Sequence, residues 1–249
     1  MDMAKTGGAA PGLLGVLGGM GPLATLDFMH KLLAATPAAN DQEHVPVLVS
    51  SIPQVPDRTA AFRGEGASPL PAMIESGRRL VDAGAGLIVM PCNTAHLWFE
   101  PLQQALGLPM LHLVDAAIEQ AIARTGAGAP LGLLATDATI ASGLYLNRAP
   151  AGAGLHWLLP TAREMIEQVM PGIEAVKAGD RVRGAALLGA AAAALATRGA
   201  RALVLGCTEI PLVLDDGCSP VPTIDATAAL AQRCVAWSRG QRAAGVLAT

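Results

Sequence analysis

Residues 198–211 read RGARALVLGCTEIP, an apolar run that stops abruptly at Gly206, Cys207 and a short polar stretch. The same pattern stands earlier in the chain, in residues 83–96, as AGAGLIVMPCNTAH, where Cys92 takes the place of Cys207. Short apolar runs bounded by glycine and polar residues are typical of strands buried in a parallel sheet. The pair therefore predicts two equivalent buried strands, each ending in a cysteine.

Two further blocks of the chain repeat in the same order. LGVLGGMGP in residues 14–22 aligns with LGLLATDAT in residues 131–139, and LPMLHLVDA in residues 108–116 aligns with SPVPTIDAT in residues 219–227. Apolar strands resemble one another, so a single match carries little weight. Three matches in one order indicate two similar halves.

Strand-length apolar runs alternate with helix-length segments along the chain. This alternation predicts the α/β class, with two pseudo-symmetric domains, each a parallel sheet sandwiched by helices, and an active site in the cleft between them. We expect one domain to comprise residues 12–115 plus a returning helix in 225–249, and the other to comprise 116–224. The expected strands are 13–17, 45–50, 86–90, 110–113, 131–135, 155–159, 202–205 and 221–224, and clear helical patterns occur at 69–83, 115–124 and 173–178.

The composition excludes several classes of protein. Hydrophobic residues make up 52% of the chain and charged residues 15%, so the chain has enough apolar side chains to fold. A net charge of -3 without a basic stripe, and an aromatic content of 3%, argue against a nucleic-acid partner. The most apolar stretch, residues 184–196, is too short to span a membrane and predicts a packed helix. We expect a cytoplasmic protein with no membrane partner.

The cysteines show neither a C-x-x-C pair nor a zinc-like spacing, so we expect free thiols and no metal site. Cys234 lies in a helical pattern and is expected to be a small buried apolar side chain. Cys218, in the loop DDGCSP, has no evident role. Cys92 and Cys207 differ from both because each ends a strand.

Ligands of open α/β sheets bind beyond the carboxyl ends of the strands. Two halves that face each other would therefore present Cys92 and Cys207 to one cleft from opposite sides. Asn93-Thr94 and Thr208-Glu209 follow the two cysteines, and such polar groups at a helix start can donate hydrogen bonds to a carboxylate. Two thiols on either side of one carbon can interconvert its two configurations, one as a base and one as an acid.

Six motifs, spread over nearly the whole chain, resemble those of the aspartate/glutamate racemase superfamily, and most closely its cofactor-independent aspartate racemase branch. CNTAH together with GCTE is the most specific part of this resemblance. The motifs are GVLGGMGP (15–22), PDRT (56–59), MPCNTAH (90–96), LLATDATI (133–140), IEAVKAG (173–179) and LGCTEIPL (205–212).

The resemblance implies roles for the residues of these motifs. Cys92 and Cys207 would be the acid/base pair. The other implied roles all concern the substrate: Asn93, Thr94 and Thr208 would hold its α-carboxylate, Met20, Gly21 and Thr136 would line the cleft, and Arg58 and Lys177 would be cations for its second carboxylate. The resemblance implies neither pyridoxal phosphate nor a metal.

Other residues near the motifs allow more than one interpretation. His96 stands four residues after Cys92, and it either tunes the thiol or serves as a packing or capping residue. Glu209 either orients the substrate ammonium, restrains a thiol or accepts backbone N–H groups. Asp115 and Asp225 match across the repeat and are expected to be N-caps. The glycines of residues 15–22 are expected to let the backbone approach the substrate.

The sequence thus predicts racemisation of an acidic amino acid, with aspartate preferred, by a two-cysteine mechanism without cofactor. The alternatives are a glutamate or broad-specificity amino-acid racemase and, from a different class, a catalytically silent dicarboxylate-binding protein. The expected partner is a small amino-acid substrate, and the expected assembly is a homodimer.

Overall fold

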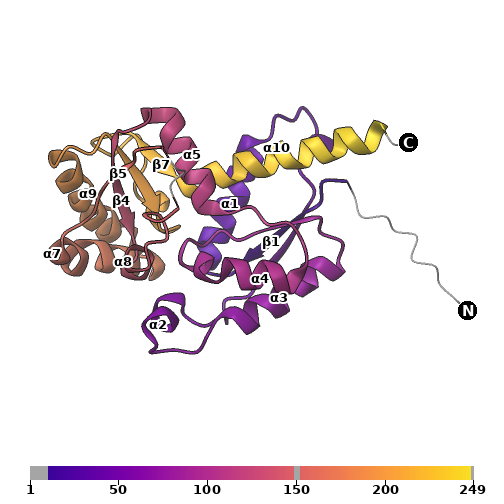
Figure 1. Ribbon diagram of the computed structural model, residues 1–249, viewed down its shortest axis with the longest axis horizontal. Coiled ribbons are helices and arrows are strands. Elements are labelled where there is room, and N and C mark those ends of the chain that lie inside the picture. Colours follow the sequence, from indigo (N-terminus) through magenta and orange to yellow (C-terminus); the bar gives the residue numbers. More distant parts are fainter. Residues whose placement is uncertain (1–10, 149–151, 248–249) are drawn as a thin grey trace, which may run out of the picture.

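The computed structural model of the protein describes residues 11–148 and 152–247, and it contains two parallel sheets flanked by helices (Figure 1). The predicted α/β class is confirmed. The first sheet has the strand order β2-β1-β3 and the second the order β5-β4-β6-β7. The strands are β1 (Leu14–Gly18), β2 (Val47–Ser51), β3 (Leu87–Val89), β4 (Pro130–Ala135), β5 (His156–Leu158), β6 (Ala202–Gly206) and β7 (Thr223–Asp225).

Helices cover both sheets. In the described part of the chain, no helix is long and apolar enough to cross a membrane. The α-helices are α1 (Pro22–Ala35), α2 (Arg58–Arg63), α3 (Leu70–Asp82), α4 (Phe99–Leu106), α5 (Leu113–Thr125), α6 (Asp137–Ala141), α7 (Ala162–Glu164), α8 (Met170–Lys177), α9 (Arg181–Thr197) and α10 (Ala226–Leu247). Short 3-10 helices are η1 (Asp41–Glu43), η2 (Thr94–Trp98) and η4 (Ile210–Leu212), and the π-helix η3 (Met165–Val169) joins α7 to α8.

The sequence repeat corresponds to equivalent strands. In the first sheet Leu14 lies between Val47 and Leu87, and in the second sheet its counterpart Leu131 lies between Trp157 and Ala202. β1 and β4 are thus matching inner strands, and β3 and β6, which lead to the two cysteines, pair with them in parallel. Parallel pairing brings the carboxyl ends of β1 and β3 to one edge of their sheet, and those of β4 and β6 to one edge of theirs.

One hydrophobic core is shared by the two sheets. Its fully buried side chains include Leu14 and Val89 of the first sheet and Leu133 and Val204 of the second, with helix α5 contributing as well. The long helix α10 packs against both α1 and α5, and Figure 1 shows it running from β7 back along the first sheet. The shared core and the returning helix hold the strand ends of the two sheets in a defined arrangement. The domain boundaries given above stay a prediction.

The strand expected at residues 110–113 is wrong. Met110 forms only an isolated parallel bridge with Ile88, and α5 begins at Leu113. The reason is that His112 caps this helix, because its Nδ1 accepts a hydrogen bond from the backbone N–H of Val114 at 3.2 Å. The matching segment in the second half does form a strand, β7.

The expected capping role holds for Asp225 and is wrong for Asp115. Asp225 Oδ1 accepts hydrogen bonds from the backbone N–H groups of Thr227 at 2.9 Å and Ala228 at 3.1 Å, at the start of α10. Asp115 lies inside the first turn of α5 and pairs with Arg148 at 2.5 Å. His112 already occupies the N-cap position, so the carboxylate of Asp115 is available for this ion pair.

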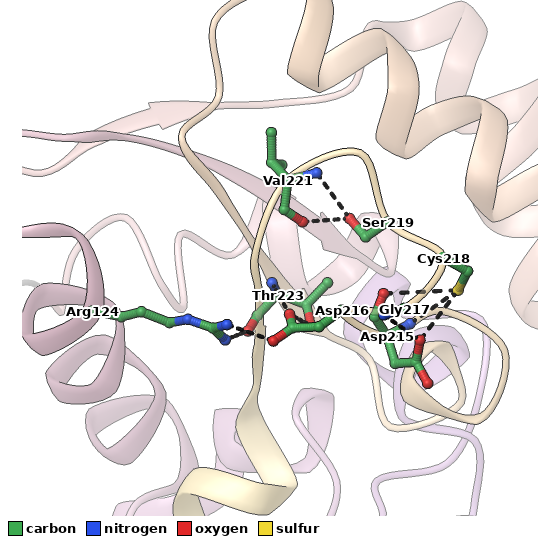
Figure 2. Close-up of polar contacts among 8 residues, drawn as sticks. All are labelled: Arg124, Asp215, Asp216, Gly217, Cys218, Ser219, Val221 and Thr223. Atoms are coloured by element: carbon green, nitrogen blue, oxygen red, sulfur yellow. Dashed lines mark hydrogen bonds and ion pairs between the residues drawn. The ribbon is translucent and has the colours of Figure 1, made fainter.

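Neither Cys218 nor Cys234 follows β3 or β6, the two matching strands that end in a cysteine. Cys234 is fully buried in α10, and burial raises the pKa of its thiol to about 12. Cys218 is exposed in the loop before β7, where the backbone N–H of Asp215 donates to its Sγ at 3.3 Å (Figure 2). The same loop is fastened by Asp216, which accepts from the backbone of Thr223 at 2.6 Å and pairs with Arg124.

The glycine loop after β1 packs against its own half as well as the cleft. Gly19 has a φ of +87°, and a Cβ at this position would lie 2.4 Å from the backbone nitrogen of Ile52. Gly19 and Gly21 also line a cavity described below. The close approach that Gly19 allows is therefore to the backbone of the segment that follows β2. The sequence led us to expect an approach to the substrate.

We predict that Gly19→Ala destabilises the protein more than Gly107→Ala. Both glycines have positive φ, which costs an alanine roughly 1–2 kcal/mol, but a Cβ at Gly107 meets no described atom within 4 Å. The clash at Gly19 should raise its cost to about 3 kcal/mol or more. The measurement is the free energy of unfolding in urea, and equal losses for the two variants would contradict the close contact.

Candidate active site

The two cysteines at matching strand ends line one cavity. Cys92 follows β3 and Cys207 follows β6, and each side chain is buried, with 6% of its surface exposed. The space between the surrounding side chains is about 20 Å³, which is enough for a single water. It is lined by both thiols and by Met20, Asp57, Arg58, Thr59, Asn93, Thr94, Thr136, Lys177, Thr208 and Glu209. Of the site residues predicted from the motifs, all except Gly21 and His96 line this cavity, which we call the inner cavity.

A larger cavity of about 360 Å³ adjoins the inner one. The two cavities share Asp57, Arg58, Lys177 and Glu209 in their walls. The remaining walls are the glycine loop and apolar side chains, namely Gly19, Gly21, Pro22, Leu23, Pro53, Val55 and Val176. The outer cavity thus has room for a small molecule, with charged groups where it meets the thiols.

Glu209 holds the thiol of Cys207. The Cys207 Sγ donates to Glu209 Oε2 at 3.0 Å, and Thr208 Oγ1 donates to the same oxygen at 3.3 Å. Burial and the charge of Glu209 raise the pKa of Cys207 well above its ordinary value, although Lys177 acts in the opposite direction. Cys207 is therefore a protonated thiol.

Two cations, Lys177 and Arg58, and two carboxylates, Asp57 and Glu209, lie where the inner and outer cavities meet. Burial acts to lower the pKa of Lys177, but the negative charges around it, among them Glu209 and Asp57, outweigh burial, and the pKa is raised overall. Lys177 is therefore an ammonium ion near both cysteines.

The other cation, Arg58, begins α2. Its Nη1 donates to the carbonyls of Val55 at 3.1 Å and Pro56 at 3.0 Å, whereas its Nε is buried without a partner among the described residues. At the other end of α2, Arg63 pairs with Asp137 of the second half. The helix that carries Arg58 is thus tied across the cleft.

Three threonine hydroxyls form a triangle where the two halves meet. Thr94 Oγ1 lies 3.1 Å from that of Thr136 and 3.0 Å from that of Thr139, and the last two lie 3.0 Å apart. Thr136 also caps α6 by accepting the backbone N–H of Thr139. Thr139 was not predicted from the sequence, although the spacing T-x-x-T could have indicated it.

Asn93 also contacts a residue that the sequence did not single out. The hydroxyl of Tyr145 donates to Asn93 Oδ1 at 2.5 Å, and both side chains are buried. Tyr145 is the only tyrosine of the chain, which is the one signal that could have drawn attention to it.

His96 supports the backbone of Cys92, and the hydrogen bonds of its ring go to backbone atoms. Its Nδ1 lies 2.8 Å from the carbonyl oxygen of Cys92, and its Nε2 accepts the backbone N–H of Leu113 at 3.1 Å. Nε2 is thus an acceptor, so the proton of the neutral ring sits on Nδ1. The ring therefore links the end of β3 to the start of α5, which corresponds to the packing and capping alternative.

We predict that His96 makes the protein unstable in mild acid. Burial lowers its pKa to about 4, with the charge of Arg148 adding to the effect. The unfolded chain therefore binds this proton first, near pH 6.5, so stability falls as the pH drops and the contribution of this ring amounts to about 3 kcal/mol by pH 4.

The measurement is the free energy of unfolding between pH 7 and pH 4. His96→Gln keeps an acceptor for Leu113 but does not titrate, so its curve should be flatter than that of the wild type. His156→Gln, at an exposed site, is the matched control and should follow the wild type. Parallel curves for His96→Gln and wild type would contradict this role.

Within residues 11–148 and 152–247, no group of three or more His, Cys, Asp or Glu side chains is arranged to hold a metal ion. The groups that converge are two thiols, amide and hydroxyl groups, two cations and two carboxylates. Two parallel sheets with matching inner strands thus each bring one thiol to a single buried cavity.

Comparison with known proteins shows the family of the chain. The model of the Asp/Glu/hydantoin racemase family matches residues 17–234, and the chain belongs to this family. It is an amino-acid racemase.

Two similar proteins cover about nine tenths of the chain, and a third covers about two thirds of it. The aspartate racemase of Picrophilus torridus superimposes with a TM-score of 0.81 at 29% identity, over 91% of this chain and 94% of the other. The broad-specificity amino-acid racemase RacX of Bacillus subtilis is 29% identical over 90% of this chain and 96% of its own length. A glutamate racemase of Corynebacterium diphtheriae is 28% identical over 64% of this chain and 62% of its own length.

Proposed function

We propose that the protein racemises an acidic amino acid, with aspartate preferred, and that Cys92 and Cys207 exchange protons with opposite faces of the α-carbon without a cofactor. The observation that carries this proposal is the convergence of both thiols, from equivalent strand ends, on one buried cavity. The cavity also holds hydrogen-bond donors for one carboxylate and cations for another. The binding-protein alternative explains the donors but leaves the second thiol without a purpose.

The reaction needs one thiolate and one thiol at the start. The thiolate removes the α-proton from one face and becomes a thiol, and the opposite thiol gives its proton to the other face and becomes a thiolate. Since the thiol of Cys207 donates its proton to Glu209, we assign the first proton removal to Cys92, which lines the same cavity as Lys177. The two cysteines have exchanged protonation states at the end, which suits a reaction that runs in both directions.

The carbanion formed between the two proton transfers is the costly species. Its negative charge spreads into the α-carboxylate, and donors aimed at that group stabilise it. Asn93, Thr94 and Thr208 are assigned to this carboxylate, with Thr136 at the side of Thr94. Met20 and Gly21 close the cleft on the side of the glycine loop.

The second carboxylate is assigned to Arg58 and Lys177. They stand where the inner and outer cavities join, so a side chain leaving the α-carbon reaches them first. The likeness to an aspartate racemase favours the short side chain. The 360 Å³ beyond the cations, and the likeness to glutamate and broad-specificity racemases, keep the longer side chains as the alternative.

The cytoplasmic localisation and the homodimer expected from the sequence stay predictions.

The direct test is loss of the α-proton signal of L-aspartate in D2O, followed by NMR, with a panel of acidic and neutral amino acids alongside. We predict that Cys92→Ala and Cys207→Ala each abolish racemisation, because each removes the group that serves one face. Cys218→Ala, at an exposed thiol outside both cavities, is the matched control and should remain active.

Either of two results would overturn the proposal. A folded, reduced wild-type protein that exchanges no acidic amino acid is not such a racemase. A single cysteine variant that keeps near-normal turnover in both directions rules out the two-thiol mechanism.

We predict that Arg58→Ala raises KM for aspartate about tenfold or more, because a hydrogen-bonded charge pair with the substrate is lost. The loss for alanine, which has no second carboxylate, should be much smaller. Arg79→Ala on the outer face of α3, where the side chain is exposed, is the control. Steady-state kinetics with both substrates make the comparison, and equal losses would contradict the assignment.

A further inference from the structure

Asn93 and Tyr145 make a buried contact across the two halves of the molecule. Asn93 stands next to Cys92 after β3, and Tyr145 lies in the turn that follows α6. Tyr145 is fully buried and Asn93 is 2% exposed, and the tyrosine hydroxyl donates to Asn93 Oδ1 at 2.5 Å. The contact thus joins the first thiol segment to the second half.

The geometry determines which way the carboxamide faces. Among the described residues, the hydroxyl of Tyr145 has a single hydrogen-bond partner, Asn93 Oδ1, and a buried phenol proton without an acceptor is costly. A flipped amide would place its NH2 against the hydroxyl and leave that proton unpaired. Burial, with the nearby charge of Asp225, raises the pKa of Tyr145, so it stays a neutral donor.

The other end of the same amide lacks a partner in the described part of the chain. Asn93 Nδ2 is buried and makes no hydrogen bond there, and Asn93 lines the cavity between the thiols. An unpaired buried N–H group costs roughly 1–3 kcal/mol, so its retention suggests a partner that arrives from outside. A substrate carboxylate in the cavity is such a partner.

We infer that Tyr145 is a positioning residue for racemisation, which locks the Asn93 carboxamide so that Nδ2 donates to the α-carboxylate of the substrate. This inference rests on the proposed function. Tyr145 acts only through Asn93, and its ring is held in place by an edge contact with Trp157, at 5.8 Å between centroids. The locked amide needs no reorientation when charge develops on the carboxylate.

The test is Tyr145→Phe, which keeps the buried ring and removes only the hydroxyl. The kcat/KM for aspartate should fall about tenfold, the equivalent of one hydrogen bond. Trp157→Phe disturbs the packing of the same ring and leaves the hydroxyl in place, so it should stay within about twofold of wild type. An unchanged kcat/KM for Tyr145→Phe would overturn the inference.

A double-mutant cycle separates positioning from packing. If Tyr145 acts through Asn93, then Tyr145→Phe has no further effect on kcat/KM in an Asn93→Ala background. A loss by the same factor in both backgrounds would show that the hydroxyl acts by another route and would overturn the inference.

A spectroscopic measurement keeps the inference testable if Tyr145→Phe does not fold. Because Tyr145 is the only tyrosine, a tyrosine label at the ring carbon that bears the hydroxyl gives a single NMR resonance. This resonance should shift on Asn93→Ala and on addition of L-aspartate to the wild type. A resonance that responds to neither change would overturn the inference.

The same label distinguishes failure of the proposed function from failure of the inference about Tyr145. A wild type that exchanges no amino acid, with a resonance that still responds to Asn93→Ala, would mean that the proposed function has failed while the Tyr145–Asn93 contact stands.

Discussion

Two parallel sheets bury their apolar faces in one common core, and the arrangement of the site depends on this burial. Leu14 and Val89 from the first sheet share the core with Leu133 and Val204 from the second. Side chains of this size contribute roughly 1.5–3 kcal/mol each when they leave water, so the two sheets are held together strongly. Because β3 and β6 are anchored in this core, the cysteines that follow them are presented to one cavity.

The two thiols are alike in the sequence but not in their surroundings. Cys207 donates to Glu209 and stays protonated, whereas Cys92 has its backbone carbonyl fixed by His96. The carboxylate of Glu209 accepts the proton of Cys207, and Lys177 lines the cavity that both thiols share.

The donors that we assign to the substrate depend on contacts between the halves. Thr94 of the first half meets Thr136 and Thr139 of the second, and Asn93 meets Tyr145. These groups are thus oriented by hydrogen bonds that run from one half to the other. The chemistry assigned to the cleft is therefore a property of the closed pair of halves, which Arg63 and Asp137 also tie together.

Local patterns in the sequence were enough to predict most of the strands, the α/β class and the pair of cysteines. Continuous apolar runs are local signals, and the repeat alone makes Cys92 and Cys207 equivalent. The apolar pattern was wrong about residues 110–113, because a side-chain cap at His112, which apolar periodicity does not report, starts a helix there.

The side chains that orient the predicted ones became evident only from the tertiary structure. Thr139, Tyr145 and the contact of His96 with Leu113 all depend on segments far apart in the chain. Periodicity and spacing report what one segment buries, and they carry no information about the partner that a buried polar group finds across the core. The repeat thus identified the two thiols, while the hydrogen bond from Cys207 to Glu209 and the contacts of the polar groups beside both thiols arose from packing.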